Sequence, residues 1–231
     1  MGAHFTEGTT GYWQRLVDAS AHHPGPAPWR LAYPARLPDG RLLMLPIRQF
    51  VDEPDRAVAS LLLEQAALDV MQALGATLAA QLERYPADAV VGLPPTGLPI
   101  AAIVARELGH ARYIPVDGTR RFWYDEALSM PVLPAAAPGA GKRLYLDPNL
   151  LPLVAGKRVI LVDDIVRTGS TLEAGWELLE LLGAKVVACG VVLRQGRRWM
   201  EKLGAERSAR LTGVLDSPLL QAVPEGWVPR V

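Results

Sequence analysis

Residues 159–171 place the strongest constraint on the fold of this chain. The segment begins with four apolar residues, continues through Asp163, Asp164 and two further apolar residues, and ends in Arg-Thr-Gly-Ser-Thr. An apolar run that leads into polar turn residues is typical of a strand buried on both faces. The apolar periodicity of residues 172–182 predicts a helix after the turn. The segment therefore predicts a strand, a tight turn and a helix, which is the local unit of an α/β sheet.

Three kinds of ligand-binding group meet at this predicted turn. Backbone N–H groups at the start of a helix bind phosphate, and the hydroxyls of Thr168, Ser170 and Thr171 add donors. Asp163 and Asp164 offer carboxylates to sugar hydroxyls or to a hydrated Mg²⁺. In the alternative interpretation the turn only caps the helix and the carboxylates are solvated, but a cap requires a single residue of this type. The turn thus predicts a site for a ligand with a phosphate, a sugar diol and a metal ion.

Residues 159–171 resemble the signature with which type I phosphoribosyltransferases bind 5-phosphoribosyl 1-pyrophosphate (PRPP). That signature is a hydrophobic strand, two acidic residues, two apolar residues, a variable residue and Thr-Gly-x-Thr, and Arg167 stands at the variable position here. The resemblance implies an α/β fold of the type I phosphoribosyltransferases, with a mostly parallel sheet flanked by helices and a small N-terminal hood. Thr119-Arg120-Arg121 resembles a basic motif of the adenine and related purine branch.

Length and composition fit this interpretation. A chain of 231 residues, half of them hydrophobic, has room for a single domain. We expect an extension and hood hairpin over residues 1–56 and an α/β core over residues 57–215. The net charge of zero argues against a general nucleic-acid or membrane-surface binder. The low cysteine content fits a reducing cytosol, and the N-terminus lacks an apolar signal segment, so a cytoplasmic protein without membrane partners is expected.

The pattern along the chain alternates between strands and helices. An Asp-Gly turn predicts a hairpin over residues 31–50. The alanine- and leucine-rich residues 57–82 predict one long helix. Further strands are expected at residues 89–92, 111–116, 158–163, 185–193 and 211–215, and further helices at residues 98–108 and 172–182.

A second loop, at residues 92–97, also joins a strand to a helix. Gly92 and Gly97 allow the backbone to approach a ligand closely, and Pro95 favours an unusual peptide conformation, such as a cis bond after Pro94. A plain connector is the alternative interpretation. In type I phosphoribosyltransferases the loop in this place binds the pyrophosphate of PRPP, and the resemblance assigns that role to Pro95, Thr96 and Gly97.

The long middle segment, residues 117–156, is predicted to be a loop, with one strand-like stretch at residues 143–146. Loops of this length often act as lids over a site. It carries Arg120, Arg121, Lys142 and Arg143, whose charges suit a ligand with several phosphates. Glu126 is a candidate acid or base, although a surface carboxylate is the commoner role for such a residue.

The resemblance implies a Mg²⁺-dependent transfer of the 5-phosphoribosyl group from PRPP to a nitrogenous base, expected to be a purine, with release of pyrophosphate. It also implies a homodimer with no nucleic-acid partner. The candidate catalytic residues are Asp163, Asp164, Arg120, Arg121 and Glu126. The 5-phosphate is assigned to Arg167, Thr168, Gly169, Ser170 and Thr171, the pyrophosphate to Pro95, Thr96, Gly97 and Lys142, and the metal ion to Asp163 and Asp164. The alternative is a non-catalytic PRPP-sensing regulator on the same fold, which usually adds a nucleic-acid-binding part; residues 1–56 contain no convincing helix-turn-helix pattern.

Overall fold

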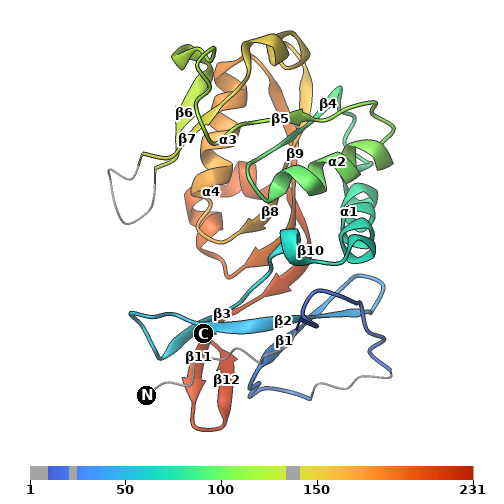
Figure 1. The fold of residues 1–231 in the computed structure, drawn as a ribbon, viewed down its shortest axis with the longest axis vertical. Helices are drawn as coiled ribbons and strands as arrows, with labels where there is room; N and C mark the ends of the chain where they lie inside the picture. Colours follow the sequence, from blue (N-terminus) through green and yellow to red (C-terminus); the bar gives the residue numbers. More distant parts are fainter. Residues whose placement is uncertain (1–9, 21–24, 134–140, 231) are drawn as a thin grey trace.

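The computed structural model describes residues 10–20, 25–133 and 141–230. Its core is a five-stranded parallel sheet in the order β10-β9-β8-β4-β5 (Figure 1). The strands are β4 Ala89–Gly92, β5 Ile114–Pro115, β8 Arg158–Val166, β9 Lys185–Gln195 and β10 Leu211–Ser217. The α/β fold with a parallel sheet, predicted from the sequence, is confirmed.

Helices cover both faces of this sheet. The helices are α1 Leu68–Leu82, α2 Gly97–Glu107, α3 Ser170–Leu181 and α4 Arg198–Ala209. In β8, Ile160 joins the buried cluster formed with α1 and α2, whereas Leu161 joins the cluster formed with α3 and α4. This alternation follows from the pleat, which directs successive side chains to opposite faces. The central strands are therefore apolar on both faces, as the run before Asp163 indicated.

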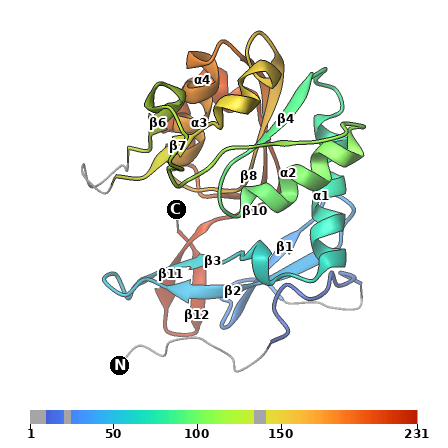
Figure 2. The same ribbon diagram turned by 45° about the horizontal axis from the view of Figure 1, so that its top comes forward.

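A second, antiparallel sheet lies beside the core and has the order β1-β2-β3-β11-β12 (Figure 2). Its strands are β1 Ala32–Arg36, β2 Leu42–Gln49, β3 Arg56–Ala59, β11 Leu219–Val223 and β12 Gly226–Pro229. The hairpin expected over residues 31–50 is present, and its turn places Gly40 at φ 91°. β11 and β12 were not predicted, so this sheet draws on both ends of the chain.

The prediction of one long helix over residues 57–82 is wrong. The chain forms β3, a short 3₁₀ turn at Leu63–Gln65 and then α1, which begins only at Leu68. Residues 57–63 alternate between buried and partly buried positions, which is the period of a strand. Their alanines and leucines suggested a helix, but pairing of β3 with β2 and β11 overrides that local preference.

The middle segment has more regular structure than its sequence indicated. β6 Ser129–Pro131 pairs antiparallel with β7 Arg143–Tyr145, and 3₁₀ turns occupy Glu126–Leu128 and Pro148–Leu153. This β6–β7 hairpin packs against α3. The strand expected at residues 111–116 is reduced to β5, and α4 was missed because its sequence is polar and Gly204, at φ 73°, interrupts its helical geometry. Within the described residues, no helix is long and apolar enough to cross a membrane.

Candidate active site

The loops that carry the candidate residues start at the carboxyl edge of the parallel sheet. Leu93, just after β4, donates its backbone N–H to the carbonyl of Val162 in β8 (2.9 Å), and Val116, just after β5, donates to the carbonyl of Gly92 (3.0 Å). The loops that follow β4, β5 and β8 therefore begin side by side. In open α/β sheets this edge is where ligands bind.

The turn after β8 has the shape of an anion cradle. β8 extends through both aspartates to Val166, and α3 begins at Ser170, two residues earlier than predicted. Gly169 adopts φ 87°, a left-handed conformation that glycine accepts without strain, and within the described residues no side chain caps α3. The Ser170 hydroxyl is buried and has no hydrogen-bond partner among the described residues. The helix start thus keeps its N–H donors and one hydroxyl available.

The two aspartates lie in different environments. Asp163 is 5% exposed, and burial, reinforced by the neighbouring Asp164 carboxylate, raises the pKa of Asp163 well above its usual value. One oxygen of Asp163 accepts the backbone N–H of Asp164 (2.9 Å). A buried carboxylate of this kind gains from a nearby cation, because opposite charge favours its ionised form. The oxygen atoms of two carboxylates are also suitable ligands for Mg²⁺, which commonly binds one or two carboxylates together with water and substrate phosphates.

The loop after β4 contacts the same aspartate. The peptide bond between Pro94 and Pro95 is cis, as expected from the sequence, and Gly97 begins α2. A Cβ atom at Gly97 would lie 2.8 Å from both the Cα and an oxygen of Asp163. Only glycine therefore allows the start of α2 to approach β8 this closely. The contact brings together Gly97 and Asp163, which the sequence assigned to neighbouring parts of one ligand.

Asp117, which the sequence reasoning missed, organises the start of the middle segment. Its carboxylate accepts the Thr119 N–H (3.0 Å), the Arg121 side chain (3.1 Å) and the Tyr124 hydroxyl (3.3 Å). Burial and the Asp117 charge raise the pKa of Tyr124. The available signal was Asp-Gly directly after a strand, since aspartate often bonds to a backbone N–H two residues ahead in a turn.

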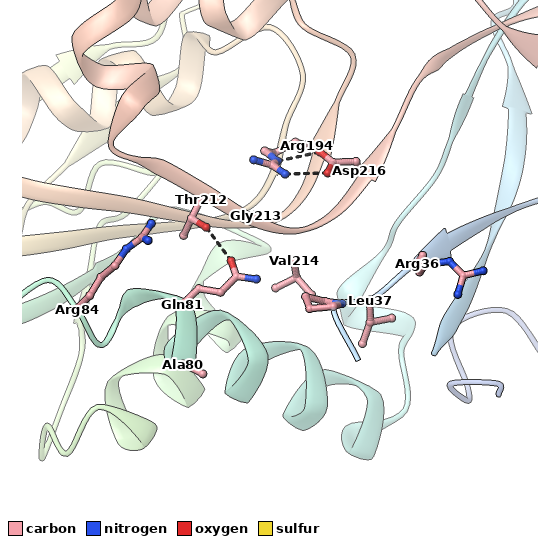
Figure 3. A pocket seen from close by; sticks show the side chains of 11 residues that line it. Arg36, Leu37, Ala80, Gln81, Arg84, Arg194, Thr212, Gly213, Val214 and Asp216 are labelled. Atoms are coloured by element: carbon pink, nitrogen blue, oxygen red, sulfur yellow. Dashed lines mark hydrogen bonds and ion pairs between the residues drawn. The ribbon is translucent and has the colours of Figure 1, made fainter. Parts of the chain in front are cut away.

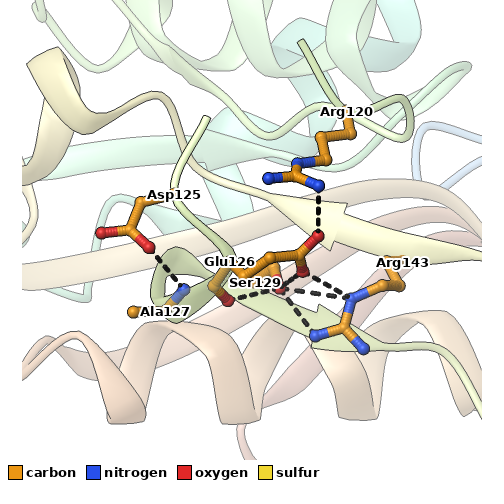
Figure 4. Close-up of polar contacts among 6 residues, drawn as sticks. All are labelled: Arg120, Asp125, Glu126, Ala127, Ser129 and Arg143. Carbon is orange, nitrogen blue, oxygen red and sulfur yellow. Dashed lines mark hydrogen bonds and ion pairs between the residues drawn. The ribbon is translucent and has the colours of Figure 1, made fainter. Parts of the chain in front are cut away.

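Glu126 lies between two arginines (Figure 4). One oxygen is 3.1 Å from Arg120, the other is 3.6 Å from Arg143, and the Ser129 hydroxyl lies 3.3 Å from Glu126. Ser129 in turn accepts hydrogen bonds from Arg143. The candidate acid or base is therefore part of an ion-pair network that connects residue 120 with the β6–β7 hairpin.

The structure brings some of the expected site residues together and separates others. Asp163 and Gly97 are in contact, and the turn at residues 167–171 follows directly from β8. Arg120, Arg121 and Glu126 bind other residues of the middle segment, and Lys142 is exposed on that segment. Two contacts of the turn were not anticipated. Arg167 lies over the ring of Phe50, which directly follows β2 (5.8 Å), and α4 packs behind Gly169.

Comparison with known proteins identifies the family of this chain. The family model "Phosphoribosyl transferase domain" matches residues 64–210. An adenine phosphoribosyltransferase from Streptomyces galbus is 32% identical over 199 residues, which cover 82% of this chain and 96% of that protein. A xanthine phosphoribosyltransferase from Chloroflexus aurantiacus is 28% identical over 165 residues, or 68% of this chain and 75% of that protein.

A solved structure supports the fold independently. The Giardia lamblia APRTase complexed with 9-deazaadenine superposes with a TM-score of 0.59 at 21% identity, over 75% of this chain and 93% of that one. The family model spans most of the sequence, the Streptomyces relative is matched over nearly its whole length, and both agree with the signature on β8. This chain is a member of the type I phosphoribosyltransferase family, a family of PRPP-dependent transferases.

Proposed function

We propose that this transferase moves the 5-phosphoribosyl group of PRPP to a ring nitrogen of a purine base, with Mg²⁺, and releases pyrophosphate. The bond from the anomeric carbon to the pyrophosphate oxygen breaks, and a bond from that carbon to the base nitrogen forms. Positive charge develops on the ribose in the transition state, so the protein's main contribution is electrostatic stabilisation and positioning.

The observation that carries the proposal is the turn after β8. Its helix start has no side-chain cap within the described residues, and the buried Ser170 hydroxyl has no partner there. An unpaired buried hydroxyl is unfavourable, and a phosphate oxygen would relieve that cost. In the proposed complex the 5-phosphate accepts hydrogen bonds from the backbone of residues 169–171 and from the hydroxyls of Thr168, Ser170 and Thr171.

The aspartates and the loop after β4 would hold the rest of PRPP. Asp163 and Asp164 would bind the ribose hydroxyls and the hydrated Mg²⁺, which supplies charge neutralisation on the departing pyrophosphate. Pro95, Thr96 and Gly97 would line the pyrophosphate, because the contact of Gly97 with Asp163 places that loop beside the carboxylates. Arg120, Arg121 and Lys142 would add positive charge from the middle segment as it closes.

The middle segment also carries a candidate group for proton transfer. The acceptor nitrogen loses a proton when the new bond forms, and Glu126 is a candidate to receive it. Its contacts with Arg120 and Arg143 hold this carboxylate in a fixed place on the middle segment. The same contacts would also allow Glu126 to act only by positioning the two arginines.

The acceptor class rests on the relatives, which are named for adenine and for xanthine, both purines. The direct test is a panel of adenine, guanine, hypoxanthine, xanthine, uracil and orotate with PRPP and Mg²⁺, read out as pyrophosphate release. We expect turnover with at least one purine and its loss when Mg²⁺ is chelated. Tight PRPP binding by calorimetry with no release from any base would contradict the proposal and indicate a PRPP sensor.

A further inference from the structure

A cavity lies between the start of α4, the link from β10 to β11, and the second sheet. Its volume is about 1240 Å³. Five arginines line it: Arg56, Arg194, Arg197, Arg198 and Arg230. Of the described residues that line it, Glu201 and Asp216 alone are acidic. The cavity wall is therefore strongly positive in a chain whose net charge is zero.

Among the described residues, three of these five arginines have no partner that balances their charge. Arg194 is paired with Asp216 (2.7 Å), and Arg56 is paired with Glu53. Arg197, Arg198 and Arg230 are exposed, and within the described residues their side chains make no hydrogen bond or ion pair. Like charges that converge without a counter-charge repel one another, so the site favours an anion.

A neighbouring pocket offers a direct comparison (Figure 3). It shares Arg194 and Asp216 with the cavity and also contains Arg36 and Arg84. In this pocket both of these arginines contact other residues of the protein. Arg36 donates to the carbonyl of Gly40 (3.1 Å), and Arg84 lies over the Tyr85 ring (5.0 Å). Within the described part of the chain, the two arginines that this pocket does not share with the cavity therefore each have a hydrogen-bond or ring partner, unlike Arg197 and Arg198.

We propose that the cavity at the start of α4 binds a small compound with more than one phosphate group, and that this binding changes the affinity of the turn at residues 167–171 for PRPP. Guanidinium groups match phosphate oxygens in pairs, and several from separate segments suit a compound with several such groups. Pro218 and Leu219 give the cavity an apolar wall, which leaves room for an organic part of the ligand.

The coupling follows from the packing of α4 against the turn, and it rests on the function proposed above for that turn. A Cβ atom at Gly169 would lie 3.3 Å from the Cα of Trp199 and 3.2 Å from the Cβ of Lys202. Lys202 also forms an ion pair with Glu173 in the first turn of α3 (2.6 Å). Trp199 lines the cavity, and its backbone also packs against Gly169. A ligand that shifts the start of α4 therefore shifts the phosphate turn as well.

The first experiment measures binding of inorganic tripolyphosphate to the full chain by calorimetry. It is done in a Thr171→Asp background, in which the added carboxylate repels anions from the phosphate turn. We expect one site to remain. Its dissociation constant should rise about tenfold for each arginine removed when Arg197→Gln and Arg198→Gln are added, as expected for loss of a charge-assisted hydrogen bond.

The matched control is Arg36→Gln with Arg84→Gln, which removes the same charge from the neighbouring pocket and should leave the dissociation constant nearly unchanged. Absence of tripolyphosphate binding in the Thr171→Asp background would overturn the site. An equal loss of affinity in Arg197→Gln/Arg198→Gln and in Arg36→Gln/Arg84→Gln would also overturn it. Citrate, which carries carboxylates, should bind more weakly; equal binding of citrate would overturn the assignment to phosphate. Melting temperatures check that each variant is folded.

The second experiment tests the coupling in the chain with Thr171 intact. PRPP affinity is measured at increasing concentrations of a phosphate compound that binds in the first experiment. We expect a several-fold change that reaches a plateau and is lost in Arg197→Gln/Arg198→Gln. A decline without a plateau would show simple competition at the PRPP site and overturn the coupling, as would a constant affinity. If PRPP does not bind even without the added anion, the proposed function is contradicted. The anion site is judged separately, because the first experiment does not use PRPP.

Discussion

At the residue scale, two buried serines differ in their hydrogen bonding. The Ser129 hydroxyl donates to the carbonyl of Glu126 (2.7 Å) and accepts from Arg143, whereas the Ser170 hydroxyl has no partner in the described part of the chain. The first therefore stabilises the folded chain, and the second carries the desolvation penalty of an unpaired polar group.

The same substitution should consequently have different effects on stability at these two positions. We predict that Ser170→Ala leaves the free energy of unfolding unchanged or raises it by up to about 1 kcal/mol, and weakens PRPP binding about tenfold. Ser129→Ala should lower the free energy of unfolding by about 1–2 kcal/mol. Urea denaturation and calorimetry measure both. Clear destabilisation by Ser170→Ala would show that the hydroxyl has a structural partner.

The buried Asp163 predicts a particular pH dependence of stability. Its pKa is raised by burial, so the folded state binds the proton more tightly than the unfolded state. The protein should lose stability as pH rises from the unfolded value of about 4 up to the raised pKa. Asp163→Asn removes that loss, so the melting temperature of the variant relative to the parent should increase with pH.

Asp88 supplies the control for this measurement. Its bonds to Arg158 lower the pKa of Asp88 to about 2, so it stays ionised between pH 5 and 8. The effect of Asp88→Asn on the melting temperature should therefore be constant over that interval, while the effect of Asp163→Asn changes. Parallel pH profiles for the two variants would show that Asp163 is not desolvated in solution.

At the element scale, the approach of α2 to β8 depends on Gly97. We predict that Gly97→Ala forces these elements apart, because the new methyl group would meet the backbone of Asp163 at 2.8 Å. Overpacking of this kind costs about 1–3 kcal/mol. PRPP binding should weaken as well. Gly118→Ala is the control, since its methyl group would meet only the Pro94 side chain at 3.5 Å. Equal stability of the two variants in urea would contradict the prediction.

A second prediction at this scale concerns the two roles open to Glu126. If it only positions Arg120 and Arg143, Glu126→Gln should lower kcat by less than about tenfold and keep the shape of its pH profile. We expect this result, with faster hydrogen exchange in residues 117–133, because the ion-pair network is weakened. A fall of about 10²–10⁴ and the loss of one limb of the profile would identify a general base. Glu64→Gln, at an exposed site, is the control.

At the scale of the whole molecule, a buried hydrogen bond connects the two sheets. The Gln195 side chain, at the end of β9, donates to the carbonyl of Ala59 in β3 (2.7 Å). We predict that Gln195→Met lowers the free energy of unfolding by about 1–3 kcal/mol, because the Ala59 carbonyl loses its donor in a buried place. Gln49→Met removes a similar bond, to the carbonyl of Pro54, at an exposed position and should change stability by no more than about 0.5 kcal/mol. Equal effects in urea denaturation would contradict a role for Gln195 in joining the sheets.

The sequence alone determined the elements that are specified by residues close together in the chain. The apolar run, the aspartates and the Thr-Gly-Ser-Thr turn specify β8, its turn and α3, since periodicity and turn residues act over a few positions. The Asp-Gly turn likewise specifies the β1–β2 hairpin. The family and the expected ligand followed from the same short segment.

Tertiary structure decided what depends on partners distant in the chain. The residues of β3 have no local reason to form a strand until β2 and β11 provide hydrogen bonds on both sides. In turn, β11 pairs with β3 on one side and with β12 on the other. The position of Glu126 between Arg120 and Arg143, and the gathering of Arg56, Arg197 and Arg230 around one cavity, likewise arise only when separate elements pack. Strand pairing and charge clustering are contacts between distant residues, and local propensity carries no information about which distant residues will meet.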